Sequence, residues 1–234
     1  MKVQLYGDSL MRGTVIEKGE RYRSVIGEML ERLGQCFGLC FTSRAHFGST
    51  IEKGWQNLQK DLARGLSCDF AVVEFGGNDC SFDWQAVAED PAGEHPPFTT
   101  PERFEALLGE MATRLQQADV TPVLMTLPPI DATRHLQFIG KTEEGRRNIL
   151  QWLGDVQMIY RFHELYSNIV AGVAKKTGSI LVDVRRRFLD RHDYTALVGS
   201  DGVHLTREGY ALVCQAFADF VAARRQAPAT KVFC

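Results

Sequence analysis

Short apolar runs alternate with segments of helical periodicity along most of this chain. Between the runs, apolar residues recur about every 3.6 positions, and the longest helical pattern spans residues 156–173. Strand–helix alternation favours parallel strands joined by right-handed crossovers. The sequence therefore predicts an α/β fold, a three-layer α/β/α sandwich around about five parallel strands. The runs read as strands buried on both faces, and they occupy residues 3–6, 36–42, 70–75, 122–127 and 179–184.

The length of 234 residues suits one domain with an ordinary core. We see no repeat, low-complexity segment or linker, so we expect a single domain over residues 1–226 and a loosely ordered tail at 227–234. Two connections, residues 80–100 and 128–154, are longer than this fold needs. Each follows a strand, so we expect both to be loops that shape a binding site at the carboxyl edge of the sheet.

Composition restricts the partners and the location of the chain. A formal net charge of -2 gives no reason to expect nucleic acid as a partner. There is no apolar run of eighteen or more residues and no visible secretory signal, so we expect neither a membrane span nor secretion. The six cysteines form no C-x-x-C pair and no zinc spacing. These features favour a cytoplasmic protein with reduced cysteines, and its oligomeric state is left open.

The segment Gly-Asp-Ser-Leu, residues 7–10, follows the first predicted strand. A serine at a strand-to-helix turn acts as a nucleophile if a base and oxyanion donors converge on it. The alternative is an ordinary turn, because Gly, Asp and Ser are common turn formers.

Three further segments favour the nucleophile interpretation of Ser9. Gly48 follows the second predicted strand, Asn78 lies in Gly-Gly-Asn-Asp after the third, and Asp201 precedes His204 by three residues after the fifth. In a parallel sheet these turns gather on one edge. The alternatives are a turn glycine, a left-handed turn asparagine, a helix-capping aspartate and a capping histidine.

Together these residues supply the parts needed for acyl transfer. His204 is the expected base for Ser9, and Asp201 the group that orients the imidazole. The expected oxyanion hole consists of the Ser9 N–H, the Gly48 N–H and the Asn78 side-chain amide. We attribute the choice of glycine at position 48 to close approach of the backbone to substrate.

These blocks resemble, in order and spacing, those of the SGNH hydrolase superfamily, the GDSL-type esterases and lipases, and the resemblance covers residue 3 to about residue 220. It implies a flavodoxin-like fold, a shallow adaptable site, and metal-independent ester hydrolysis through an acyl-serine intermediate without a cofactor.

Other residues near the predicted site have two interpretations. Asp8 and Asp79 suit either Mg²⁺ binding or turn-locking hydrogen bonds, and we favour the latter. The aromatic and apolar residues of the long connections either line a pocket or anchor loops; they are Phe82, Trp84, Phe98, Pro129 and Ile130. We interpret the remaining histidines as surface or packing residues; they are His46, His95, His135, His163 and His192.

The sequence thus predicts a serine esterase acting on a small-molecule ester with a small or medium acyl group, such as an acetylated sugar. A lysophospholipase, thioesterase or acyltransferase of the same family is an alternative. A non-catalytic protein that binds a small ligand at the same edge is another.

Overall fold

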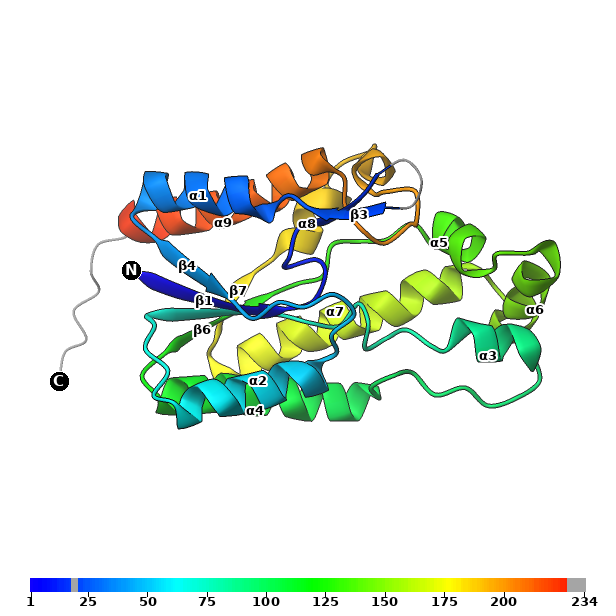
Figure 1. The fold of residues 1–234 in the computed structure, drawn as a ribbon, viewed down its shortest axis with the longest axis horizontal. Coiled ribbons are helices and arrows are strands. Elements are labelled where there is room, and N and C mark those ends of the chain that lie inside the picture. The colour runs from blue at the N-terminus through cyan, green and yellow to red at the C-terminus, as the bar shows by residue number, and fades with distance from the viewer. Residues whose placement is uncertain (18–20, 227–234) are drawn as a thin grey trace.

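The computed structural model describes residues 1–17 and 21–226. Within them, five parallel strands form the central sheet in the order β4-β1-β5-β6-β7 (Figure 1). Counting only these strands, the order is 2-1-3-4-5, the flavodoxin-like arrangement, which confirms the predicted fold class. The strands are β1 (Lys2–Gly7), β4 (Cys40–Ser43), β5 (Phe70–Glu74), β6 (Thr121–Met125) and β7 (Ile180–Val182).

Helices cover both faces of the sheet (Figure 1). One layer contains α1 (Ile26–Phe37), α8 (Val184–Leu189) and α9 (Arg207–Gln226), and the other contains α2 (Ile51–Ala63), α4 (Pro101–Gln117) and α7 (Gln157–Thr177). Successive strand side chains point to opposite layers, so Tyr6 and Val73 join one core cluster while Leu5 and Val72 join the other. At 21 residues, α7 is the longest helix of the described chain and confirms the predicted one.

The prediction for the second strand is wrong at its start. Cys36 lies in α1, which ends where Gly38 takes a left-handed φ of 59°, and the strand begins only at Cys40. This strand is also mostly exposed rather than buried on both faces, because β4 is the edge of the sheet.

The two long connections contain helices, so the prediction that they are loops is wrong. They form α3 (Trp84–Glu89), α5 (Ala132–Ile139) and α6 (Glu143–Leu153). Side chains of Asp83, Asp131 and Thr142 accept hydrogen bonds at the three helix starts. These helices share a third apolar cluster beyond the carboxyl ends of the strands, at the right of Figure 1.

The chain does not pass from β1 directly into a helix, as the sequence led us to expect. Turns after β1 lead to a hairpin of β2 (Thr14–Glu17) and β3 (Arg21–Ser24), and α1 follows. The Tyr210 hydroxyl of α9 donates to the Thr14 carbonyl at 2.9 Å and anchors the start of this hairpin. A short 3-10 helix, η1 (Tyr194–Leu197), precedes the last predicted site segment.

The predicted tail at 227–234 lies outside the described residues. Among the described ones, we find no helix with the length and apolarity needed to cross a membrane. Cys36, Cys40, Cys68, Cys80 and Cys214 are free thiols.

Candidate active site

Ser9 lies in a tight turn directly after β1. Asp8 Oδ1 accepts a hydrogen bond from the Leu10 N–H at 2.8 Å, and the Ser9 carbonyl accepts from the Thr14 N–H at 3.0 Å. A Cβ at Gly7 would lie 2.5 Å from Met11 Cβ and 2.9 Å from the Glu74 carbonyl, so only glycine fits there. Asp8 therefore locks the turn as predicted, and Ser9 is held in one place.

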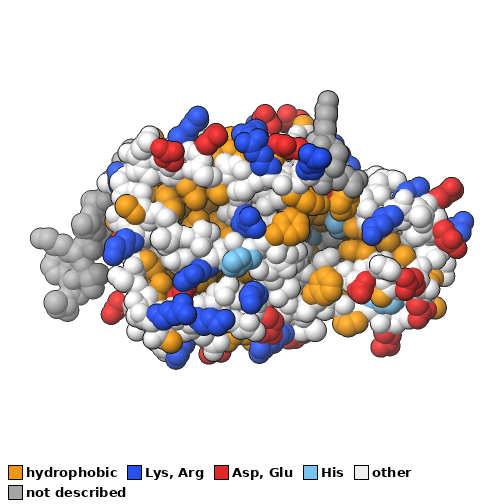
Figure 2. Space-filling model, in the orientation of Figure 1, with side chains coloured by type: hydrophobic (Ala, Val, Ile, Leu, Met, Phe, Trp, Pro, Cys, Tyr) orange, Lys and Arg blue, Asp and Glu red, His pale blue; other side chains and the backbone are white. Residues whose placement is uncertain are grey.

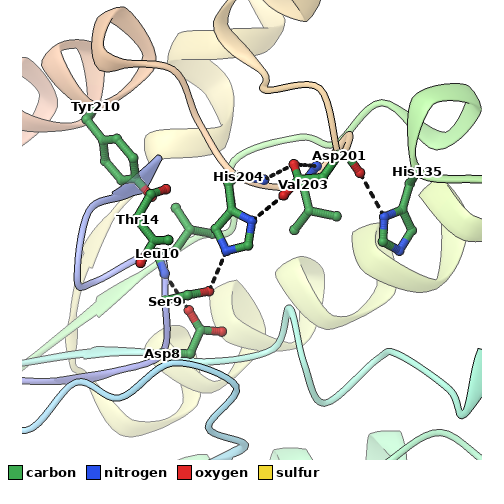
Figure 3. A network of polar contacts seen from close by, with 9 residues as sticks. All are labelled: Asp8, Ser9, Leu10, Thr14, His135, Asp201, Val203, His204 and Tyr210. Carbon is green, nitrogen blue, oxygen red and sulfur yellow. Dashed lines mark hydrogen bonds and ion pairs between the residues drawn. The ribbon is translucent and has the colours of Figure 1, made fainter. Parts of the chain in front are cut away.

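The structure brings Ser9, His204 and Asp201 into one chain of hydrogen bonds (Figure 3). Ser9 Oγ lies 2.9 Å from His204 Nε2, although 195 residues separate the two in sequence. His204 Nδ1 lies 2.6 Å from Asp201 Oδ2. The other carboxylate oxygen, Asp201 Oδ1, accepts from the N–H groups of Val203 at 3.1 Å and His204 at 3.0 Å.

The charge of Asp201 determines the proton positions in this chain. Burial by itself would raise the pKa of Asp201, but its hydrogen bonds with the His204 ring and with the N–H groups of Val203 and His204 hold the pKa below its ordinary value. Asp201 is therefore ionised and accepts the Nδ1–H of His204. The lone pair of Nε2 is then free to accept the Ser9 hydroxyl proton, which is the arrangement a general base requires.

Helix α5 supports the loop that carries Asp201. His135 Nδ1 donates to the Asp201 carbonyl at 3.0 Å (Figure 3), and the Asp131 N–H donates to the Gly202 carbonyl at 2.8 Å. Gly202 has φ +77°, and a Cβ there would lie 2.4 Å from the backbone nitrogen of His135. His135 was expected to be a surface or packing residue, and no role was predicted for Gly202. The glycine after Asp201 was the one signal that could have found this contact.

Two of the predicted oxyanion donors are available. The N–H groups of Ser9 and Gly48 have no acceptor within the part of the chain that the structure describes. Gly48 has φ +71°, and a Cβ there would meet nothing within 4 Å. Glycine is thus favoured at this position by its left-handed backbone, and close approach of the backbone to substrate stays a prediction.

The third predicted donor, Asn78, is fully engaged. Its Nδ2 donates to Asp8 Oδ2 at 2.8 Å and to the Ser49 carbonyl at 3.1 Å. An amide nitrogen carries two hydrogens, and both are used here. The Asp8 contact orients the side chain, while the Ser49 contact occupies the hydrogen that an oxyanion would need.

Three buried carboxyl groups lie beneath this edge of the sheet. Burial raises the pKa of Asp8 to about 6 and that of Asp79 to about 7. Burial and the neighbouring Asp8 raise the pKa of Glu74 well above its ordinary value, which favours the protonated form of this carboxyl group. Glu74 lies in a strand predicted to be buried on both faces, and a glutamate there was a signal that the sequence offered and we did not use.

Asp79 has a role beyond the predicted turn-locking one, and its carboxylate also interacts with the Gly76 backbone within its own turn. Its Oδ1 accepts from the Ile51 N–H at 2.9 Å and so holds the start of α2 against the β5 turn. For the alternative metal interpretation of Asp8 and Asp79, the described residues contain no group of three or more His, Cys, Asp or Glu side chains placed to hold an ion.

The rings of Tyr22 and Phe47 pack against His204 and form what we call the aromatic wall, which was not predicted from the sequence. The Phe47 ring stacks on the imidazole, with centroids 5.7 Å apart and an interplanar angle of 10°, and the Tyr22 centroid lies 5.1 Å from that of His204. Both aromatic side chains are exposed, Tyr22 at 41% and Phe47 at 49%.

A small cavity of about 30 Å³ lies near the site. Gly77 and Val203 line it, and they neighbour Asn78 and His204 in sequence. Of the residues predicted to line a pocket or anchor loops, Trp84 and Ile130 also line this cavity. Phe82 is buried in the third cluster, Pro129 is buried, and Phe98 is exposed.

Sequence comparison identifies the family. Residues 5–212 match the GDSL-like Lipase/Acylhydrolase family. The chain belongs to this family of GDSL-type ester hydrolases. A GDSL esterase/lipase of Arabidopsis thaliana, CPRD49, is 25% identical over 160 residues, which are 68% of this chain. The chain spans about half, 55%, of the length of that GDSL relative.

Several solved structures have the same fold. The lipase/acylhydrolase from Enterococcus faecalis superposes with a TM-score of 0.66 at 19% identity, over 95% of this chain and 96% of that one. A catalytic mutant of Axe2, an acetylxylan esterase from Geobacillus stearothermophilus, gives 0.64 at 18% identity, over 94% and 93%. The acetyl xylan esterase AlAXEase gives 0.58 at 20% identity, over 94% and 100%.

Proposed function

We propose that this chain hydrolyses carboxylic esters of short acyl groups through an acyl-serine intermediate. The observation that carries the proposal is the hydrogen-bonded chain from Ser9 Oγ through His204 to ionised Asp201. In family members with this arrangement of residue types, serine is the nucleophile, histidine the base and aspartate the orienting group.

In the proposed reaction, Ser9 Oγ attacks the ester carbonyl carbon while its proton passes to His204 Nε2, and Asp201 stabilises the imidazolium. The N–H groups of Ser9 and Gly48, joined by Asn78, donate to the oxyanion. The imidazolium then protonates the departing alcohol oxygen as its bond to carbon breaks. Water, deprotonated by His204, attacks the acyl-serine, releases the acid and restores the serine hydroxyl.

The size of the cavity beside the site supports a short acyl group. At about 30 Å³ it holds little more than a methyl group or a water molecule. Its lining includes Gly77 and Val203, the sequence neighbours of Asn78 and His204, and we place the methyl end of the acyl group toward this space. We therefore propose acetyl esters as the preferred substrates.

The aromatic wall supports a sugar as the alcohol part of the ester. Exposed aromatic rings beside a reactive group offer a flat apolar surface for a ligand, and Tyr22 and Phe47 form one against His204. Two of the structural relatives are acetylxylan esterases, which is consistent with this choice.

An ester panel tests the proposal. p-Nitrophenyl acetate, acetylated xylo-oligosaccharides, lysolipids and acyl-CoA thioesters are offered to the unaltered chain and to Ser9→Ala. We expect acetyl esters to be cleaved fastest and Ser9→Ala to lose at least 10³-fold in kcat. Faster cleavage of lysolipids or thioesters would favour the lysophospholipase or thioesterase alternative. Transfer of the acyl group to an added alcohol rather than to water would indicate an acyltransferase. If no ester is turned over, the alternative of a non-catalytic binding protein is favoured.

A further inference from the structure

A second cavity, far larger than the one at the site, lies between the sheet and the layer of α1 and α9. Its volume is about 290 Å³. The lining is almost entirely apolar and runs along β1 from Met1 to Leu5, beneath α1 and α9. In Figure 2, hydrophobic side chains are visible on the surface below α1, above the place where β4 lies in Figure 1.

A cavity of this size is not a packing defect of ordinary magnitude. Protein interiors are close-packed, and a dry apolar cavity of about 150 Å³ already binds a benzene-sized molecule. The helix above it is amphipathic, yet none of its residues is buried. Ile26, Leu30 and Leu33 of this helix line the cavity. An apolar ligand would fill the space and bury this face of α1.

One end of the cavity is cationic. Arg224 and Arg225, in the last turn of α9, belong to its lining, as does Met1. Their guanidinium groups lie over the rings of Phe220 and Phe37, 5.2 and 5.4 Å from the ring centroids. Among the described residues, the lining contains no acidic side chain. The site therefore suits a molecule with one apolar chain and one anionic group at its end.

We propose that this cavity binds a free fatty acid, with the chain along β1 and the carboxylate at Arg224 and Arg225. The site is separate from the catalytic one, because neither Ser9 nor His204 belongs to its lining. Leu10 and Met11, which directly follow Ser9, line it, so a bound chain contacts the turn that carries Ser9 from behind. The proposal does not depend on the ester substrate.

Titration calorimetry of the Ser9→Ala chain with saturated fatty acids of increasing length tests the proposal without interference from turnover. We expect one saturable site whose affinity rises about fourfold for each added methylene until the cavity is filled. Replacing both cationic residues, Arg224→Ala with Arg225→Ala, should weaken binding about tenfold. Leu30→Trp, which fills the cavity from the partly exposed α1, should abolish it.

A matched control is Arg114→Ala with Lys175→Ala, which removes two exposed cations from the opposite layer. This control should bind as the parent does. The proposal is overturned if the Ser9→Ala chain shows no saturable binding of fatty acid. It is also overturned if the two control substitutions weaken binding as much as the two arginine substitutions do. It is also overturned if light scattering shows a dimer that Leu30→Trp dissociates while fatty acid has no effect, because a second copy then covers the cavity. If Leu30→Trp does not fold, the arginine pair and the chain-length series still decide.

Discussion

Asn78 is the residue whose contacts differ most from those its proposed role requires. Both hydrogens of its Nδ2 are donated, one to Asp8 Oδ2 and one to the Ser49 carbonyl. The contact with Asp8, at 2.8 Å, holds the amide in place. The bond to Ser49, at 3.1 Å, is the longer one. We infer that substrate binding releases the hydrogen from Ser49 and that the oxyanion accepts it.

Replacing Asn78 tests this role. We expect Asn78→Ala to lower kcat for p-nitrophenyl acetate about 10²–10³-fold with little change in KM, because an oxyanion donor acts mainly in the transition state. Asn148→Ala is the matched control, since Asn148 also donates from Nδ2 to a backbone carbonyl, that of Ala88, away from the site. A rise in KM with unchanged kcat in Asn78→Ala would assign it to substrate binding instead.

The buried acids predict an unusual pH dependence of stability. The pKa of Asp79 is raised to about 7 by burial, against an ordinary value of 3.8. Between about pH 4 and pH 7 the folded chain keeps a proton that the unfolded chain loses, so stability falls as pH rises through this range. The loss is on the order of a few kcal/mol and is complete above about pH 7.

Asp79→Asn removes this titration while its side-chain oxygen can still accept from Ile51 N–H. We expect urea unfolding to show a smaller loss of stability between pH 5 and pH 8 in Asp79→Asn than in the parent. The remaining loss comes from Asp8 and Glu74, whose pKa values are raised in the same direction. Exposed Asp190→Asn should leave the pH dependence unchanged. Parallel pH curves for Asp79→Asn and the parent would show that Asp79 is not a protonated group in the folded state.

At the scale of elements, two parts of the fold complete the site. The hairpin β2–β3 brings Tyr22 to His204, and α5 meets the loop that carries Asp201. Neither element has a strong local pattern, because β2 and β3 have four residues each and α5 has eight. Their positions depend on contacts with distant segments, such as that between Tyr210 and Thr14. Such contacts are invisible to periodicity.

Because α5 packs against the 201–204 loop, we expect one added methyl group at Gly202 to lower kcat strongly. In Gly202→Ala the Cβ would lie 2.4 Å from the backbone nitrogen of His135 and 2.5 Å from the Asp131 carbonyl oxygen. We expect kcat to fall at least tenfold, because the loop must move and shift Asp201 away from His204. The measurement is steady-state kinetics with p-nitrophenyl acetate.

Gly154→Ala is the control for backbone strain. Its φ of +71° is close to that of Gly202, but its Cβ would meet nothing within 4 Å. Gly154→Ala should cost about 1 kcal/mol in stability and leave kcat unchanged. Equal losses of kcat in both variants would show that strain, and not contact with α5, controls the loop.

The aromatic wall has its own test at Phe47, which follows β4 and packs against Tyr22 of the hairpin. Removing the stacked ring in Phe47→Ala should raise KM for an acetylated xylo-oligosaccharide several-fold with less effect on p-nitrophenyl acetate, because only the sugar needs the aromatic surface. Phe98→Ala, which removes another exposed ring at 59% exposure, should change neither value. Equal changes for both esters would indicate that Phe47 acts through His204 and does not bind the sugar.

At the scale of the whole molecule, the topology explains which parts could be predicted. Parallel strands carry their following turns to one edge, so Ser9, Gly48, Asn78 and the 201–204 loop are brought to that edge from four segments. For the first three segments that gathering follows from strand order, whereas the 201–204 loop comes after α8 and η1 and contacts α5. The burial of Glu74 follows from its place in a strand predicted to be buried, but its raised pKa could not be predicted, since that depends also on Asp8, which follows the neighbouring strand β1.

The central claim is that four distant segments make one hydroxyl reactive, and intact mass after phosphonate treatment tests it most directly. We expect a fluorophosphonate to add one adduct to the unaltered chain, mapped to Ser9 by peptide sequencing. Neither Ser9→Ala nor His204→Ala should gain mass on the same timescale. An unaltered chain that gains no mass, or an adduct on another residue, would contradict the account.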